Sequence, residues 1–454
     1  MKCTLHNLGC KVNSYETEAM RQLLEAAGYE IVEFGSETAD VYIINTCTVT
    51  NIADRKSRQM LHKAKKDNPN AVVVAGGCYV QEAGEKLLAD EAVDIIVGNN
   101  RKGQIVEVLE EYFKGRNIDN SFIDINKTRE YENLEINASL AHTRAYIKIQ
   151  DGCNQFCTYC IIPFARGRVR SRKIEDIIDE VRKLAESGCH EIVVTGIHLS
   201  SYGLDFDNTE YNAQPVPNAE RLLQVLEAIA AVDGIDRIRL GSLEPRIITD
   251  TFLERLSAIP QICPHFHLSL QSGCDETLKR MNRRYDTEEF REGVEKIRRY
   301  FDKPAITTDV IVGFPGETNE EFAITRKYLE EINFFEMHVF KYSRRKGTIA
   351  DRMENQIADS VKSERSDALI ELDEELSRAY RESFAGSAEV VLVEEYVECD
   401  GIKYAVGHTK RYVKVYISLD CAQEQDIKIN AEIPVIITGI FGKDSVISKV
   451  AIAN

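Results

Sequence analysis

The sequence lacks several features that would place it in a familiar class. No run of apolar residues is long enough to cross a bilayer, and residues 1–11 are mixed and polar where an export leader would join a basic start to an apolar stretch. We therefore expect a cytoplasmic protein without a membrane partner. Positive charge is also in deficit, since 57 Lys and Arg oppose 74 Asp and Glu, giving a net charge of −17. That balance argues against a protein that coats nucleic acids generally.

Disulfide bonds are not expected either. Twelve cysteines in a chain without an export signal indicate metal ligands or buried free thiols, because cytoplasmic thiols stay reduced. The length of 454 residues leaves room for roughly three domains, each with its own core.

Local clusters of basic residues exist despite the negative total. Residues 141–173 contain Arg144, Lys148, four further arginines and Lys173 against the single acid Asp151, and residues 55–66 carry bases without an acid. A run of this kind is more often the solvated face of a helix. Because several of them flank cysteine motifs, a polyanionic substrate is also a reasonable hypothesis.

Three cysteines lie within eight residues, at Cys153, Cys157 and Cys160. A [4Fe–4S] cube offers four irons, so three thiolates would close three corners and leave one iron open to a small molecule. The alternatives are a zinc knuckle, which would need a fourth ligand nearby, and a chance group of buried cysteines. We favour the iron–sulfur interpretation.

Residues 1–115 alternate short apolar stretches with helical patterns, which predicts a parallel α/β sheet. Cys10, Cys47 and Cys78 each follow one of the first three predicted strands. The carboxyl ends of parallel strands share one edge of a sheet, so these three thiols should meet there. The alternative for each cysteine alone is a buried small apolar side chain, and we assign that role to the cysteines outside the two triads.

The alternation resumes in residues 141–358 after a predicted linker over 116–140. Six strands with intervening helices predict an open partial barrel, with active groups at the carboxyl ends of its strands. The alternative is that the turns after these strands serve only to connect each strand to the next helix. The candidates at these strand ends are Thr195, Gly196, Ser242, Glu244, Ser269, Gln271, Val312 and Gly313.

The last part of the chain changes character. A charged helix is predicted over residues 359–382, and short extended runs separated by Gly and polar turns over 383–454 predict a small all-β barrel. The predicted fold class is therefore α/β, with an N-terminal parallel sheet, a central open six-stranded barrel and a C-terminal β-barrel.

The segment 152–172 closely resembles the signature of radical S-adenosylmethionine (SAM) methylthiotransferases, including its Pro163-x-x-Arg166-Gly167 stretch. The resemblance implies that the cluster on the Cys153 triad binds and cleaves SAM, and that the Cys10 triad holds a second [4Fe–4S] cluster used in sulfur insertion. It also implies that the strand-end candidates surround SAM, with Thr195 and Gly196 near its methionyl part and Val312 and Gly313 near its adenine. An electron donor such as flavodoxin or ferredoxin would be a partner.

Two short segments resemble one branch of that family. Gly9–Asn13 and Gln271–Cys274 look like the branch that acts on N6-threonylcarbamoyladenosine in tRNA, whereas the branch acting on isopentenyladenosine has Gln-Met in place of Lys11-Val12. The expected activity is addition of a methylthio group to C2 of that base beside the anticodon. The alternatives are the isopentenyl branch, methylthiolation of a ribosomal-protein aspartate, and a non-catalytic carrier of two clusters, which would normally close every iron with cysteine.

Residues 383–454 resemble the TRAM domain, an RNA-binding module, and this resemblance makes Lys410, Arg411 and Lys414 candidate RNA contacts. Arg166, Arg168, Arg170 and Arg172 are also candidates for contact with the tRNA. One or two of them could bind the substrate carboxylate through paired hydrogen bonds, although arginines serve equally well for gripping phosphates.

Overall fold

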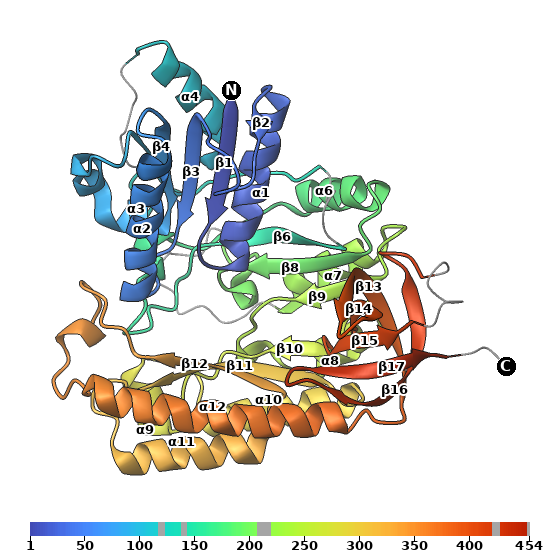
Figure 1. The fold of residues 1–454 in the computed structure, drawn as a ribbon. Coiled ribbons are helices and arrows are strands. Elements are labelled where there is room, and N and C mark those ends of the chain that lie inside the picture. The colour runs from blue at the N-terminus through green and yellow to red at the C-terminus, as the bar shows by residue number, and fades with distance from the viewer. Residues whose placement is uncertain (117–122, 138–142, 207–218, 420–426, 452–454) are drawn as a thin grey trace.

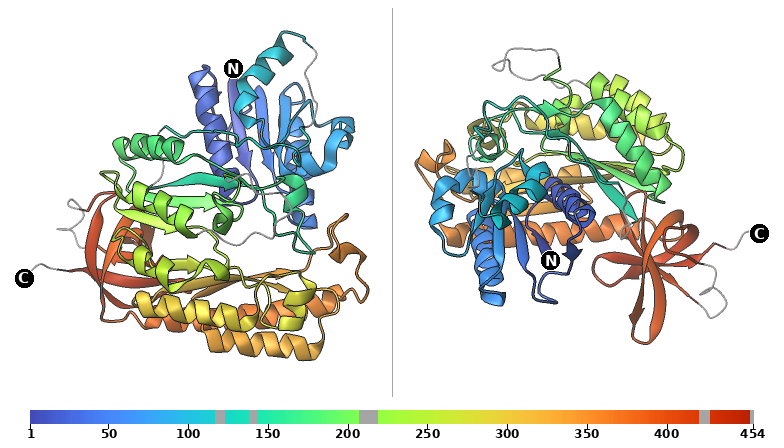
Figure 2. Two further views of the ribbon diagram at one scale, coloured as in Figure 1. Left: turned by 180° about the vertical axis from the view of Figure 1, so that it is seen from behind. Right: turned by 90° about the horizontal axis from the view of Figure 1, so that it is seen from above.

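The computed structural model describes residues 1–116, 123–137, 143–206, 219–419 and 427–451. An N-terminal sheet domain sits above one end of a central barrel, and a small β-barrel packs near the other end (Figures 1 and 2). This arrangement confirms the predicted fold class. In the described part of the chain, no helix combines the length and apolarity that a membrane span requires.

The N-terminal sheet is parallel throughout, in the order β2-β1-β3-β4-β5. Its central strands β3 and β4 are buried along their whole length, which explains their continuous Val and Ile content. The two-residue strand β2 was not predicted, because it is too short to show a pattern. The strands are β1 Lys2–Asn7, β2 Glu30–Ile31, β3 Val41–Thr46, β4 Val72–Gly77 and β5 Ile95–Val97.

The helices of this domain start at the cysteine-bearing edge. Helix α1 begins directly after Cys10, and α3 begins at Cys78 itself. Helix α3 ends at Ala83, and a 3-10 turn follows it from Gly84. The helices are α1 Lys11–Ala26, α2 Asn51–Asp67, α3 Cys78–Ala83 and α4 Ile105–Phe113, with 3-10 turns Gly84–Ala89 and Lys102–Gln104.

Six parallel strands form the central barrel within the described residues. They lie in chain order β6, β8, β9, β10, β11 and β12, and the bridges Ile238–Ile262 and Leu243–Leu268 join the two halves of the sheet. A two-residue strand, β7, adds an antiparallel edge to β6. The strands are β6 Arg144–Asp151, β7 Arg170–Ser171, β8 Glu191–Gly196, β9 Arg237–Leu240, β10 His265–His267, β11 Ala305–Val312 and β12 Glu336–Lys341.

Helices cover the outside of this open barrel and bury its largest apolar core. Capping boxes at Asp286 and Thr318 start two of them, as the local Asp-x-x-Glu and Thr-x-x-Glu sequences dictate. The helices are α5 Ile162–Ala165, α6 Ile174–Glu186, α7 Ala219–Ala230, α8 Asp250–Ser257, α9 Asp275–Arg280, α10 Thr287–Tyr300 and α11 Asn319–Ile332, with 3-10 turns Leu199–Ser201, Pro245–Ile247 and Ala350–Arg352.

Helix α12 (Asp359–Glu382) leads to the C-terminal barrel, which closes in the order β13-β14-β15-β17-β16. This barrel packs against the strand starts of the central barrel, where Arg144 at the start of β6 contacts Glu394. Its strands are β13 Ala388–Cys399, β14 Ile402–Thr409, β15 Lys414–Ser418, β16 Glu432–Phe441 and β17 Ser445–Val450. Cys421, predicted to be structural, lies outside the described residues.

The described part of the linker, residues 123–137, contains neither helix nor strand. It is nevertheless packed, because Leu134 and Ile136 are buried in the barrel core. The hydroxyl of Tyr15 on α1 donates to the carbonyl of Leu134. The linker therefore joins the two domains by side-chain packing as well as by the chain.

Candidate active site

The N-terminal thiols lie at one edge of the first sheet. Cys10 follows β1, Cys47 follows β3, and Cys78 opens the helix after β4. Because these strands are adjacent and parallel, the structure brings the three thiols together. Gly9 leaves the space they need, since a Cβ at this residue would lie 3.1 Å from the sulfur of Cys47.

The second triad lies in the loop between β6 and α5. The loop is held from the opposite side of the barrel: the amide of Thr158 donates to the carbonyl of Met281 (3.0 Å), and Asn282 Nδ2 donates to the carbonyl of Phe156 (3.0 Å). Burial raises the pKa of the Cys160 thiol to about 12. Metal ligation favours the thiolate of such a residue, because the bound cation offsets the cost of the buried charge.

Hydrogen bonds reach sulfurs of both triads. Arg283 Nη1 donates to Cys157 Sγ at 3.2 Å, and Asn99 Nδ2 donates to Cys78 Sγ at 3.7 Å. Donors to sulfur of this kind stabilise and tune iron–sulfur clusters. Arg283 and Asn99 were not predicted from the sequence, because neither lies in a cysteine motif.

The spacing of the thiols argues against single zinc ions. Tetrahedral zinc with bonds of about 2.3 Å would hold its sulfurs roughly 3.8 Å apart. Among the described residues, only His267, Asp309 and His338 place three potential ligand atoms within 4.8 Å of one another. Neither cysteine triad forms a comparably tight group, and three thiolates in each are the donor set of a [4Fe–4S] cube with one open iron.

A mostly apolar cavity of about 230 Å³ opens beside the second triad; we call it the cluster-side cavity. Tyr159, Ile311 and Phe340 form apolar walls, and Gln271 is the predicted SAM residue that lines it. Val312 and Gly313 are not part of its lining: the carbonyl of Val312 accepts from the Tyr342 amide, and the amide of Gly313 donates to Glu317.

A second cavity, of about 550 Å³, lies in the barrel interior; we call it the barrel cavity. The predicted residues Thr195, Gly196 and Ser242 line it, together with Cys10 and Lys11 of the N-terminal domain. Asp309 lines both cavities, so the two adjoin. Four of the strand-end candidates therefore line one or other of two adjoining cavities, and contact with SAM by these residues stays a prediction.

Two further candidates have structural partners. Glu244 is buried and accepts a hydrogen bond from Gln155 in the Cys153 loop at 2.9 Å. Burial would raise the pKa of Glu244, but contacts from His198 and Arg246 lower it to about 2. The carbonyl of Ser269 accepts from Arg283. Glu244 thus helps to hold the Cys153 loop in place, and Ser269 helps to hold Arg283, which borders the second triad.

The prediction that Arg166, Arg170 and Arg172 contact RNA is wrong for this conformation, because all three are buried. Arg166 donates to Glu16 at 2.8 Å and to Asn13 at 2.6 Å, both on α1 of the N-terminal domain. Arg170 lies 3.7 Å from Asp151, and Arg172 pairs with Glu180.

Arg168 differs from these three arginines. It is partly exposed, and its guanidinium lies 4.3 Å from the centre of the Phe156 ring. An RNA contact by Arg168 stays a prediction.

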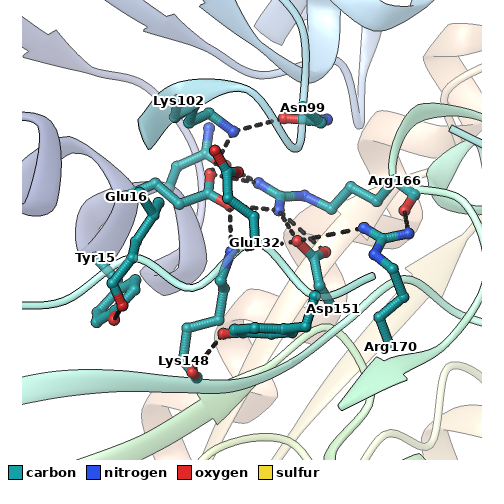
Figure 3. Close-up of polar contacts among 12 residues, drawn as sticks. Tyr15, Glu16, Asn99, Lys102, Glu132, Lys148, Asp151, Arg166 and Arg170 are labelled. Atoms are coloured by element: carbon teal, nitrogen blue, oxygen red, sulfur yellow. Dashed lines mark hydrogen bonds and ion pairs between the residues drawn. The ribbon is translucent and has the colours of Figure 1, made fainter. Parts of the chain in front are cut away.

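Arg166 belongs to a buried ionic network that joins the two domains (Figure 3). Lys102 and Lys148 lie 2.8 and 3.0 Å from the carboxylate of Glu16, and Lys148 also lies 3.3 Å from Asp151. Burial alone would raise the pKa of Glu16, but the cations around it hold that pKa well below its usual value. Glu16 therefore stays charged and paired across the domain boundary.

The predicted RNA-binding cations of the C-terminal barrel also have partners within the protein. Lys410 Nζ donates to the carbonyl of Pro260 at 2.9 Å, and Arg411 pairs with Glu389 at 3.0 Å and with Asp302 at 3.4 Å. Lys414 is half-buried beside the ring of Tyr416. Lys410 and Arg411 therefore help to attach the small barrel to the central one, and RNA contact by these half-buried side chains stays a prediction.

Known proteins resemble this chain along most of its length. A model of the radical SAM superfamily matches residues 147–329, and one described as uncharacterized protein family UPF0004 matches residues 2–98. A threonylcarbamoyladenosine tRNA methylthiotransferase MtaB from Bacillus subtilis is 43% identical over 90% of this chain and 89% of its own. A tRNA-2-methylthio-N(6)-dimethylallyladenosine synthase from Aquifex aeolicus is 36% identical over 87% of this chain and 88% of its own.

A solved structure shares the fold. The radical S-adenosylmethionine methyltransferase TsrM from Kitasatospora setae, with cobalamin and a [4Fe–4S] cluster bound, aligns with a TM-score of 0.57 at 16% identity and covers 77% of this chain and 76% of its own. With the thiol sites and the curated relatives, this places the chain among radical SAM proteins. It belongs to the radical SAM methylthiotransferase family, whose cofactors are SAM and [4Fe–4S] clusters.

Replacing Arg166 with Met should destabilise the protein strongly. The change removes one cation from a buried network and leaves Glu16 with fewer partners, and breaking a buried ion pair costs about 3–5 kcal/mol. The measurement is urea unfolding followed by circular dichroism. The matched control is Arg182→Met, which removes an exposed Arg–Asp pair on α6 and should change little. Equal midpoints for the two variants would contradict a stabilising role for the network.

Proposed function

We propose that this chain adds a methylthio group to C2 of N6-threonylcarbamoyladenosine in tRNA. One observation carries the proposal: two separate three-thiol sites open onto adjoining cavities. Cys160 lines the cluster-side cavity, Cys10 lines the barrel cavity, and Asp309 lines both. A radical generated at one site and a sulfur held at the other would thus act on one substrate between them.

The C2–H bond of adenine is too strong for acid–base chemistry, so a radical is required. When bound, a [4Fe–4S] cluster on Cys153, Cys157 and Cys160 would supply the electron that cleaves SAM, and a second on Cys10, Cys47 and Cys78 would hold the sulfur to be transferred. The protein itself contributes the side chains that surround the bound groups. Tyr159, Ile311 and Phe340 form an apolar wall for an adenosyl group, and Arg283 places a positive charge beside Cys157.

The use of two SAM molecules, one for the radical and one for the methyl group, is part of this proposal, as are a flavodoxin or ferredoxin donor and a cytoplasmic location. The threonylcarbamoyl substrate is favoured because the relative named for it is more similar, at 43% identity, than the relative named for dimethylallyladenosine, at 36%. Adjoining cavities argue against a simple electron carrier, which has no need of them.

The tRNA is expected to bind around the barrel mouth. Asn51 at the start of α2 bonds to Ser343 and Arg344, so α2 and the loop after β12 lie side by side. Together they present the mouth patch, an exposed set of cations beside the exposed apolar side chains of Ile52 and Ile349. Cations with apolar neighbours suit phosphates and unstacked bases. The mouth patch consists of Arg55, Lys56, Lys341, Arg344 and Lys346.

The activity is tested on tRNA from cells that lack this protein. We expect liquid chromatography with mass spectrometry to show threonylcarbamoyladenosine without its methylthio form, and purified enzyme with SAM and a reductant to restore that form. Methylthiolation of isopentenyladenosine alone, or of a ribosomal protein, would contradict the proposal. Failure to form 5′-deoxyadenosine from SAM would contradict the radical reaction.

The two cluster sites should be separable. Replacing Cys153, Cys157 and Cys160 with Ala should leave about half the iron of the reconstituted protein and abolish SAM cleavage, because the remaining triad lies in another domain. The matched variant replaces Cys10, Cys47 and Cys78 and should retain SAM cleavage while losing methylthiolation. Complete loss of iron in either folded variant would contradict two independent sites.

Replacing Arg55, Lys56 and Lys346 with Ala should weaken tRNA binding and flatten its dependence on salt. Each cation that no longer neutralises a phosphate should reduce the slope of log affinity against log salt by roughly one. Filter binding across a salt series measures it. Lys327→Ala, an exposed lysine on α11, is the control. An unchanged slope in the triple variant would place the RNA elsewhere.

A further inference from the structure

One cation faces the barrel cavity without a carboxylate partner. Lys11 is exposed and lines this cavity beside Cys10, whereas the neighbouring Arg239 and Arg144 are bound to Glu191 at 2.9 and 3.2 Å. Within the residues that the structure describes, Lys11 has no direct ion pair; burial and the nearby Arg239 and Arg144 lower its pKa, while Glu191 and Asp309 favour its charge from a greater distance. Its ammonium therefore keeps three donors available to a ligand.

The acids that line the same cavity already have partners. Asp309 lies 3.3 Å from His267 Nε2, and Glu336 pairs with Arg381 at 2.5 Å. His267 is fixed in turn by Thr307, whose hydroxyl lies 3.0 Å from its Nδ1. The cavity thus offers one unpaired positive group, and its paired acids oppose a negative ligand less than free carboxylates would.

We propose that Lys11 binds the carboxylate of the threonylcarbamoyl group in the barrel cavity, and this inference rests on the proposed function. A carboxylate that leaves water for a partly enclosed cavity needs an opposite charge, which Lys11 supplies. An isopentenyl group has no charge and needs none. Lys11 determines specificity for the acidic side chain, the role that the buried Arg166, Arg170 and Arg172 cannot fill.

The position of Lys11 also places the proposed carboxylate-binding group next to the thiols proposed for sulfur transfer. Lys11 follows Cys10 directly and is the first residue of α1, whose next turns carry Asn13 and Glu16. Those two residues are held by Arg166 of the barrel domain. The interdomain network therefore fixes the helix end that presents both the thiol and the ammonium, and a substrate held by Lys11 lies beside the N-terminal thiols.

The test compares two anticodon stem-loops that differ at one group: threonylcarbamoyladenosine with a free carboxylate, and the same base with that carboxylate blocked as a methyl ester. Reconstituted full-length wild type, Lys11→Met and Lys11→Arg are assayed for kcat/KM on both. We expect Lys11→Met to lose about 10- to 100-fold on the free acid, mainly through KM, because bonds between charged groups contribute at this level. On the ester it should equal wild type within about threefold. Lys11→Arg should recover most of the loss, since it keeps the charge.

Iron content and SAM cleavage without RNA separate this role from cluster assembly, and both should match wild type in Lys11→Met. Lys327→Met on α11 is the matched control and should show no preference change. Equal losses on acid and ester, or loss of iron, would overturn the assignment of Lys11 as the carboxylate-binding group. If wild type converts neither stem-loop, the proposed function itself fails.

Discussion

The carboxylate of Glu16 is buried at the boundary between two domains and is surrounded by three cations, Lys102, Lys148 and Arg166 (Figure 3). A buried charge is tolerated only when its partners are in place, so the network is satisfied in one relative placement of the domains. Arg345 adds a second attachment, because it pairs with Asp54 on α2 at 2.6 Å. Both attachments hold the N-terminal thiols over the barrel.

This placement gives the two thiol sites different surroundings. The cluster-side cavity is small and mostly apolar, as suits an adenosyl group that must be kept from water. The barrel cavity is larger and is lined by histidines, Asp309 and Lys11, as suits a polar nucleoside. Since Asp309 lines both, ligands bound in the two cavities would lie next to each other.

The C-terminal barrel is attached by the same kind of interaction. Arg237 at the start of β9 pairs with Glu432 and donates to backbone carbonyls of the small barrel, and Tyr412 lies against Arg144 and Arg239. Cations that look available for RNA in the sequence are thus used to join domains. Under the proposed function, the cations that stay exposed, such as those of the mouth patch, are the ones expected to contact RNA.

The sequence by itself determined the order of strands and helices, the grouping of the thiols and the family, because hydrophobic period, strand ends and short cysteine spacing are local properties. Only the tertiary structure decided what each charged side chain does. Arg166 meets Glu16 and Arg345 meets Asp54 across 150 and 291 residues of sequence. Such partners are set by how domains pack, and a run of arginines has the same sequence pattern when it binds RNA as when it is buried in a domain boundary. The sequence shows that Lys11 differs from the residue at this place in the isopentenyl branch. It does not show that Lys11 faces the barrel cavity without an ion-pair partner.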